Sequence, residues 1–350
     1  MLRTAVMFAA GVVVGAAVAT RASTRRRATL ARGPVAALSN PPADAADLVR
    51  SCCAEDDTLD VNGILWLEHV NLVVGDRERA EAFYVDLLGF TPCPSPSFHV
   101  NLGRQQLHLS MGTPQVIHGC VGLAVPSLDS VRARMPAAAA ELAGTKFAAV
   151  EEGSALRVTC PWGNVYRLYP VADDAGPAAE EGLPKLARLQ AGIDAGMGVG
   201  GQPGIRYIEL AVPRRRSAAV GTFYSEQFGC DVQLAADAAV VPVGPSCHLV
   251  FRECDADPVA EAAMEGVHIA IYVSDWKGAY ERLSALGLTW SNPRFTHLDM
   301  CDDFEQARAS RQFRFKHIVD PSGERLLELE HETRALRHFQ WFKPVHYLPA

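Results

Sequence analysis

The feature that most constrains this chain is an internal repeat. The segment Phe83–Gly89 recurs as Phe223–Gly229, and each copy begins with Phe-Tyr and places a glycine six residues after the phenylalanine. Pro161-Trp-Gly163 recurs in the same way as Pro321-Ser-Gly323. Repeats of this kind are supersecondary units that cannot bury their apolar face alone and must pack against a neighbouring unit. The chain is therefore predicted to be built from several copies of one unit.

Each unit is predicted to contain a strand, a helix and three further strands. The four opening strands are predicted at 65–74, 120–125, 206–212 and 266–273, where apolar residues alternate with others. In the first unit Asp76 is expected to cap a helix over Arg77–Leu88. One face of each sheet would lie under the helix, and the opposite face would line a cup that a second unit closes. The sequence thus predicts an α+β fold of four βαβββ modules.

Composition narrows the class of protein. The chain has 350 residues, of which 49% are hydrophobic and 21% charged, which is typical of soluble domains and sufficient for two cores. The net charge of -7 argues against a nucleic-acid partner, which would require a basic face. The nine cysteines show no CxxC spacing and are expected to be reduced thiols.

The N-terminus differs from the rest of the chain. An apolar run at 5–19 is followed by several arginines, and no acidic residue precedes Asp44. An Arg-rich, acid-free leader is typical of a transit peptide, which predicts an organellar location, either chloroplast or mitochondrion. The alternative is membrane attachment through residues 5–19, although a span usually needs roughly 20 residues. The predicted organisation is a targeting or anchor segment with linker (1–62), a first domain (63–171), a linker (172–204), a second domain (205–332) and a tail (333–350).

Two groups of residues carry a family resemblance. Leu67-Glu-His-Val-Asn-Leu-Val-Val-Gly-Asp76 precedes the first Phe-Tyr pair, and Gly266–Val273 is followed by Asp320-Pro-Ser-Gly323 and Glu328. These stretches resemble the opening and closing motifs of the vicinal oxygen chelate superfamily, which includes glyoxalase I, extradiol dioxygenases and bleomycin-resistance proteins. The resemblance covers roughly Leu65 to Glu330. It implies two tandem glyoxalase-like domains, each pair of modules forming a cup-shaped mixed sheet.

The resemblance also implies a divalent metal ion (Fe, Mn, Zn or Ni) held by the first and last strands of each unit. In chain order these positions hold His69 and His108, Cys120 and Arg167, Tyr207 and His248, and His268 and Glu328. An arginine in place of a carboxylate would repel a divalent cation. The metal candidates are therefore His268, Glu328, His248, His69 and His108. Glu328 is also the candidate catalytic base, although it lies one residue further past Gly323 than the usual family spacing, with Glu330 on the same face.

The pairing of units decides which candidates meet. Pairing in chain order, as in dioxygenases, would join His248, His268 and Glu328, a set that suits Fe(II) or Mn(II). Crosswise pairing, as in two-domain glyoxalases, would join His69, His108, His268 and Glu328, and would leave the positions of the second and third units in the other cup. The long linker between the halves favours pairing in chain order.

These features predict a divalent-metal-dependent enzyme that acts on a small vicinal-oxygen substrate, by dioxygenase-type or glyoxalase/isomerase-type chemistry. The alternative is a non-catalytic protein of the same fold that binds a small ligand. The partner is in either case a small molecule, and the sequence does not give the oligomeric state. Tyr272, Glu209 and Glu330 are candidates for hydrogen bonds to the substrate. The Asp299–Asp303 cluster lies in a long loop that is expected to be either a lid over the cup or exposed surface.

Overall fold

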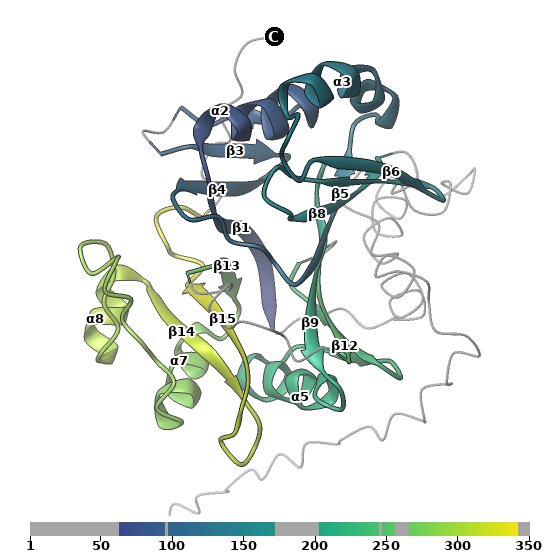
Figure 1. The fold of residues 1–350 in the computed structure, drawn as a ribbon. Helices are drawn as coiled ribbons and strands as arrows, with labels where there is room; N and C mark the ends of the chain where they lie inside the picture. Colours follow the sequence, from purple (N-terminus) through teal and green to yellow (C-terminus); the bar gives the residue numbers. More distant parts are fainter. Residues whose placement is uncertain (1–62, 95–96, 172–202, 245–246, 256–265, 342–350) are drawn as a thin grey trace, which may run out of the picture. The chain divides into compact units, whose positions relative to one another are not determined.

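The computed structural model describes residues 63–94, 97–171, 203–244, 247–255 and 266–341 (Figure 1). All the described elements belong to one compact unit. The targeting and anchor predictions for residues 1–62, and most of the predicted linker, lie outside these ranges and stay predictions. Among the described residues, no helix has the length and apolar character needed to cross a membrane.

The described elements form the four expected modules. The first contains β1 (Ile64–Val74), helix α2 (Arg77–Ala80) with its π-helical continuation η1 (Glu81–Leu87), β2 (Thr91–Pro92), β3 (His99–Leu102) and β4 (Gln105–Met111). The second contains β5 (Gly119–Val125), α3 (Leu128–Glu141), β6 (Ala148–Glu152), β7 (Ala155–Thr159) and β8 (Val165–Pro170). The third contains β9 (Gly204–Pro213), α5 (Ser217–Phe228), β10 (Gln233–Leu234), β11 (Ala238–Pro242) and β12 (His248–Cys254).

The fourth module departs from the pattern. It contains β13 (His268–Val273), α7 (Trp276–Ala285), an additional helix α8 (Phe304–Ser310), β14 (Gln312–Val319) and β15 (Arg325–Arg334). Where the other modules have a short strand after the helix, this one has a single bridge between Thr289 and Phe315. A long connection therefore replaces that strand, and β15 extends two residues into the predicted tail.

The helix boundaries follow from local sequence. The side chains of Asp76, Ser127 and Asp275 each accept a backbone hydrogen bond of 2.9 to 3.1 Å from the first turn of the helix that follows. The repeated glycines, Gly89 and Gly229, both have φ of 77° and end their helices in the left-handed conformation that glycine adopts at no steric cost. The Phe-to-Gly spacing of the repeat therefore corresponds to the number of residues between a phenylalanine inside the helix and the glycine at which the helix ends.

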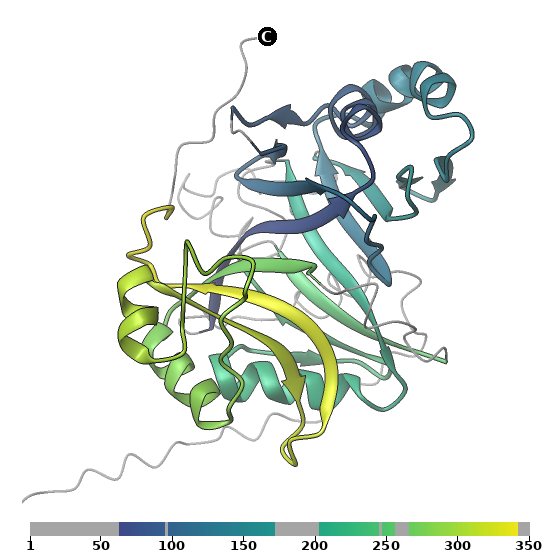
Figure 2. The same ribbon diagram turned by 60° about the vertical axis from the view of Figure 1, so that its left-hand side comes forward.

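The strands form two mixed sheets. The first sheet has the order β14-β15-β13-β1-β4-β3-β2, and the second has the order β10-β11-β12-β9-β5-β8-β7-β6 (Figures 1 and 2). The opening strands of two modules meet antiparallel at the centre of each sheet, β1 with β13 and β5 with β9. The first module therefore pairs with the fourth and the second with the third. The α+β class and the four modules are confirmed, but the preference for pairing in chain order is wrong.

Glycines in β5 show why this pairing is accommodated. Gly119 has φ of 146°, and a Cβ at this position would lie 1.9 Å from the carbonyl oxygen of Glu209 in β9. At Gly122 a Cβ would lie 2.1 Å from the ring of Tyr207, which is also in β9. Only residues without a side chain permit β9 to approach β5 so closely. Linker length sets only how far apart two modules can lie, whereas the absence of side chains at these two glycines permits β5 and β9 to pair.

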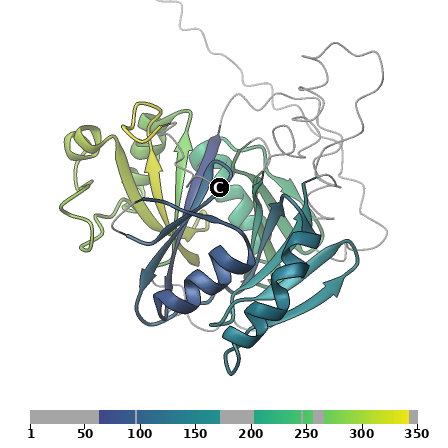
Figure 3. The same ribbon diagram turned by 90° about the horizontal axis from the view of Figure 1, so that it is seen from above.

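The helix layer joins the modules differently from the sheets. The repeated tyrosines make buried contacts between modules that are adjacent in the chain: the Tyr84 and Tyr166 hydroxyls lie 2.8 Å apart, and the Tyr224 hydroxyl lies 2.8 Å from Nε2 of His331. Nδ1 of His331 donates to the Leu329 carbonyl at 2.7 Å, so Nε2 accepts from Tyr224. Helices α2–η1 and α3 accordingly lie side by side (Figure 3). The sheets therefore join the first module to the fourth and the second to the third, whereas the tyrosine contacts join the first to the second and the third to the fourth. Each module is held by two others.

A candidate metal centre between the first and fourth modules

Three buried side chains converge where the first and fourth modules share a sheet. They are His69 on β1, His268 on β13 and Glu332 on β15, and one donor atom from each lies within 4.8 Å of the others. β13 pairs with both β1 and β15, so the three strands are neighbours in the sheet. The two imidazole rings have centroids 5.6 Å apart and meet at 71°. The crosswise pairing thus places two histidines and one carboxylate in a single buried group.

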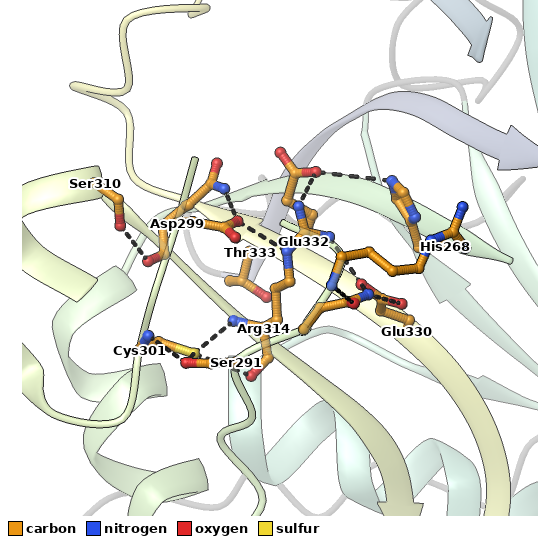
Figure 4. A network of polar contacts seen from close by, with 12 residues as sticks. His268, Ser291, Asp299, Cys301, Ser310, Arg314, Glu330, Glu332 and Thr333 are labelled. Atoms are coloured by element: carbon orange, nitrogen blue, oxygen red, sulfur yellow. Dashed lines mark hydrogen bonds and ion pairs between the residues drawn. The ribbon is translucent and has the colours of Figure 1, made fainter. Parts of the chain in front are cut away.

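Two arginines hold the carboxylate of Glu332. Oε2 accepts from Arg314 at 2.8 Å (Figure 4), and Oε1 accepts from Arg334. The two guanidinium groups hold the pKa of Glu332 well below its usual range, so this carboxylate is ionised at neutral pH. Nε2 of His268 lies 3.8 Å from Oε2 of Glu332, which is too long for a hydrogen bond. Burial lowers the pKa of His268 to about 3, with a further contribution from Arg314, so this imidazole is neutral.

Arg314 is the centre of a larger buried network. Its Nε donates to Asp299 at 2.8 Å and one terminal nitrogen donates to Glu330 at 2.8 Å, in addition to the contact with Glu332. Arg334 also pairs with Glu68. Four acids, Glu68, Asp299, Glu330 and Glu332, therefore surround two arginines, and burial raises the pKa of Asp299 and of Glu330. At full ionisation the acids outnumber the arginines by two.

The long connection of the fourth module covers this network. Asn292 donates to Glu330 at 2.9 Å, and the ring of Phe295 meets the His268 ring edge-on at a centroid distance of 5.7 Å. The guanidinium of Arg314 lies over the face of the Phe295 ring, with its Cζ atom 4.5 Å from the ring centroid. Asp299 is buried among these groups. The expectation that this cluster is exposed surface is therefore wrong for Asp299, because its carboxylate is the partner of Arg314.

The structure brings some of the predicted site residues together and separates others. His69 and His268 meet as crosswise pairing requires. His108 stacks on His69 with centroids 3.7 Å apart but is not a member of the converging group. Glu328 lies four residues before Glu332 and contacts Lys316 at 3.3 Å. His248 lies on β12 in the other sheet, so the set of His248, His268 and Glu328 does not form.

Sequence reasoning missed Glu332, Arg314 and Arg334. The alternation that places Glu328 and Glu330 on one strand face continues to Glu332, so the signal was present. The predicted end of the domain at residue 332 placed this glutamate at the margin of the fold, whereas the strand continues to Arg334. The arginines had no comparable signal, because their role depends on acids brought close by folding.

The cup face of the second sheet holds the group expected from crosswise pairing. Arg167 donates to the Cys120 sulfur at 3.3 Å, and the hydroxyls of Tyr169 and Tyr207 lie 3.1 Å apart. Glu209, a predicted substrate contact, accepts from Arg252 at 2.9 Å on this face and is remote from the candidate metal centre. Within the described ranges, no group of three metal-binding side chains occurs here.

No family model matches the chain. No curated protein matches it either. Solved structures that are similar to it include a proposed dioxygenase from Bacillus subtilis, with 12% identity, 80% of this chain and 88% of that chain covered and a TM-score of 0.47. Glyoxalase I from Zea mays gives 14% identity, 77% and 92% coverage and a TM-score of 0.44. A 2,3-dioxygenase from Pseudomonas gives 15% identity, 82% and 94% coverage and a TM-score of 0.24.

Proposed function

We propose that this protein is a divalent-metal-dependent enzyme acting on a small substrate with two adjacent oxygens, and that His69, His268 and Glu332 hold the metal. The observation that carries the proposal is the convergence of these three donors within 4.8 Å in a buried site. Two histidines and one carboxylate with open coordination positions suit non-haem Fe(II), and the same donors also bind Mn(II) or Zn(II).

The chemistry of the residues fits a bound cation. Ligand atoms on one ion are about 3 to 4 Å apart, given metal–ligand distances near 2.1 Å, so the 3.8 Å between His268 Nε2 and Glu332 Oε2 suits a pair of ligands. The low pKa of His268 keeps its imidazole in the neutral form that binds metals. When they are ionised, the four acids of the buried network outnumber its two arginines, which offsets the repulsion between these arginines and a bound cation.

The metal, when bound, would act as a Lewis acid on the two substrate oxygens and stabilise negative charge that develops there. Other residues of this chain orient the proposed ligands and enclose the site. Arg314 and Arg334 orient the Glu332 carboxylate and keep it ionised. Phe295 packs on His268 and excludes water from that side of the site. Burial raises the pKa of Tyr272, which therefore keeps its proton and donates to Glu68 at 3.2 Å.

Metal content by mass spectrometry on the full chain tests this proposal. The protein would be reconstituted with Fe(II), Mn(II), Zn(II) and Ni(II) in turn, beside the variants His268→Ala and Glu332→Gln. The matched controls are Glu328→Gln, on the same strand face, and His248→Ala, in the other sheet. We expect one metal per chain, lost in the first two variants and kept in both controls.

Two results would contradict the proposal. Loss of metal with Glu328→Gln and retention with Glu332→Gln would move the site along β15. Absence of metal from the wild-type protein after reconstitution with all four ions would remove the enzyme hypothesis and leave a small-ligand-binding protein. Given a bound metal, catechols under dioxygen and 2-oxoaldehydes with a thiol are the substrates to assay, because they distinguish the dioxygenase type from the glyoxalase type.

A further inference from the structure

Three imidazole rings form a stacked column that ends at the candidate metal centre. His99 on β3 stacks on His108 on β4 with centroids 3.6 Å apart and planes at 8°. His108 stacks in turn on His69 with centroids 3.7 Å apart and planes at 18°. The rings of His99 and His108 are half-buried, whereas His69 is buried. The strands impose this order, because His99 lies opposite His108 in the β3–β4 pair and β4 lies beside β1.

Stacking excludes His108 as a second ligand of the ion that His69 would hold. A metal bonds to an imidazole nitrogen along the lone pair, which lies in the plane of the ring. For two near-parallel rings at this separation, a shared ion about 2.1 Å from each nitrogen would lie more than about 50° out of at least one ring plane. His69 and His268 have no such conflict, because their rings meet at 71° and their in-plane directions can converge.

A hydrogen bond at the ring edge also holds His108. Its Nε2 lies 3.1 Å from Oε1 of Gln106, and Nε2 of Gln106 donates to Asn101 at 2.6 Å. Because the amide oxygen of Gln106 only accepts, Nε2 of His108 carries the hydrogen. Gln106 and Asn101 are buried. The orientation of the His108 ring is therefore fixed by a hydrogen-bond chain and by the His99 ring, before any contribution from His69.

We propose that His108 is a positioning residue that fixes the imidazole of His69 by ring stacking, so that the metal centre needs an aromatic ring at position 108 but no nitrogen. This inference rests on the metal centre proposed above. Residues that orient a metal ligand typically contribute about 10- to 100-fold to metal affinity. A flat ring held in place restricts His69 to rotamers whose lone pair faces His268 and Glu332.

The test compares His108→Phe with His108→Ala in the full chain, with His118→Ala as a control for losing a histidine elsewhere. Two quantities are measured: the Co(II) dissociation constant, with the Co(II) absorption spectrum as a signature of the ligand set, and the NMR shifts of the His69 ring protons without metal. We expect His108→Phe and His118→Ala to bind Co(II) within about threefold of wild type and with the same spectrum. We expect His108→Ala to bind about 10- to 100-fold more weakly.

The outcomes separate this inference from the proposed function. If a folded His108→Phe protein loses as much affinity as His108→Ala and its spectrum changes, the nitrogen of His108 is a ligand and the inference fails. Unchanged affinity in His108→Ala also overturns it. If the wild-type protein binds no metal, the proposed function fails by itself. The metal-free shifts then decide the inference: shifts of the His69 ring that are lost in His108→Ala and kept in His108→Phe support it, and unchanged shifts in both refute it.

Discussion

Replacement of Arg314 by methionine should destabilise the protein strongly, because it removes a buried cation from three carboxylates. Its guanidinium donates to Asp299, Glu330 and Glu332 at 2.8 Å each, and its side chain is 3% exposed. Methionine fills a similar volume but removes the cation that three buried carboxylates share. Breaking a buried ion pair by removing one partner costs about 3–5 kcal/mol, because the remaining charge is left without compensation.

The expected loss is near the lower end of that range, about 3 kcal/mol. Each acid keeps one other partner: Asn292 remains on Glu330, Arg334 on Glu332, and Gln312 on Asp299. The loss should also depend on pH. Burial already raises the pKa values of Asp299 and Glu330 in the folded state, and removal of Arg314 raises them further, so the folded variant binds more protons than folded wild type does. Its deficit is then smaller at pH 5 and grows as pH rises to 8.

Urea unfolding followed by circular dichroism at pH 5 and pH 8 measures both effects. A loss of about 3 kcal/mol corresponds to a fall in the urea midpoint of roughly 1 M or more. Arg132→Met is the matched control, because Arg132 makes its ion pairs with Asp129 and Glu151 on the exposed surface, where such pairs contribute little. A midpoint for Arg314→Met equal to wild type at both pH values, or a deficit larger at pH 5 than at pH 8, would refute the reasoning.

Three further predictions concern other parts of the fold. Gly122→Ala places a Cβ 2.1 Å from the buried ring of Tyr207 and should cost about 1–3 kcal/mol, which a thermal melt would detect as a lowered midpoint. Tyr224→Phe leaves Nε2 of the buried His331 without its 2.8 Å donor and should cost about 1–3 kcal/mol in urea unfolding. Burial lowers the pKa of His248 to about 4, so stability that is fully present above pH 6.5 is lost as the unfolded chain takes up the proton between pH 6.5 and 4, by up to about 3 kcal/mol. Because the pKa values of His268 and His331 are also lowered to about 3, His248→Gln should reduce, but not abolish, the loss of stability in a urea series over that interval, and an unchanged slope would contradict the assignment.

Local signals in the sequence were sufficient to predict the four modules. Asp76 and Ser127 cap the helices they precede, and the glycine of the Phe-to-Gly repeat ends the helix where spacing predicts. These features depend on hydrogen bonds and backbone conformations within a few residues. The strand alternation was also readable, so His69 and His268 were placed on the correct faces. The additional helix α8 was not predicted, because it lies in the connection after α7, where each of the other three modules has a short strand.

The pairing of modules was not readable, because it depends on contacts between distant residues. Linker length suggested the wrong partner, whereas the close approach of β9 to Gly119 and Gly122 is visible only in the folded chain. The carboxylate of the candidate site was displaced by four residues, from Glu328 to Glu332. Three glutamates on one strand face satisfy the alternation equally, and only the convergence with His69 and His268 in the folded chain distinguishes Glu332.

The central position of β1 has a consequence for synthesis of the chain. β1 lies between β4, which follows it closely, and β13, whose His268 is 199 residues after His69. At about 5–20 residues per second, a ribosome needs roughly 10–40 s to make that stretch. Throughout that interval the edge of β1 that pairs with β13 remains unpaired. An unpaired strand edge is a template for association with other chains. A nascent chain of this protein therefore depends on protection of that edge, and a product truncated before residue 266 would carry it permanently.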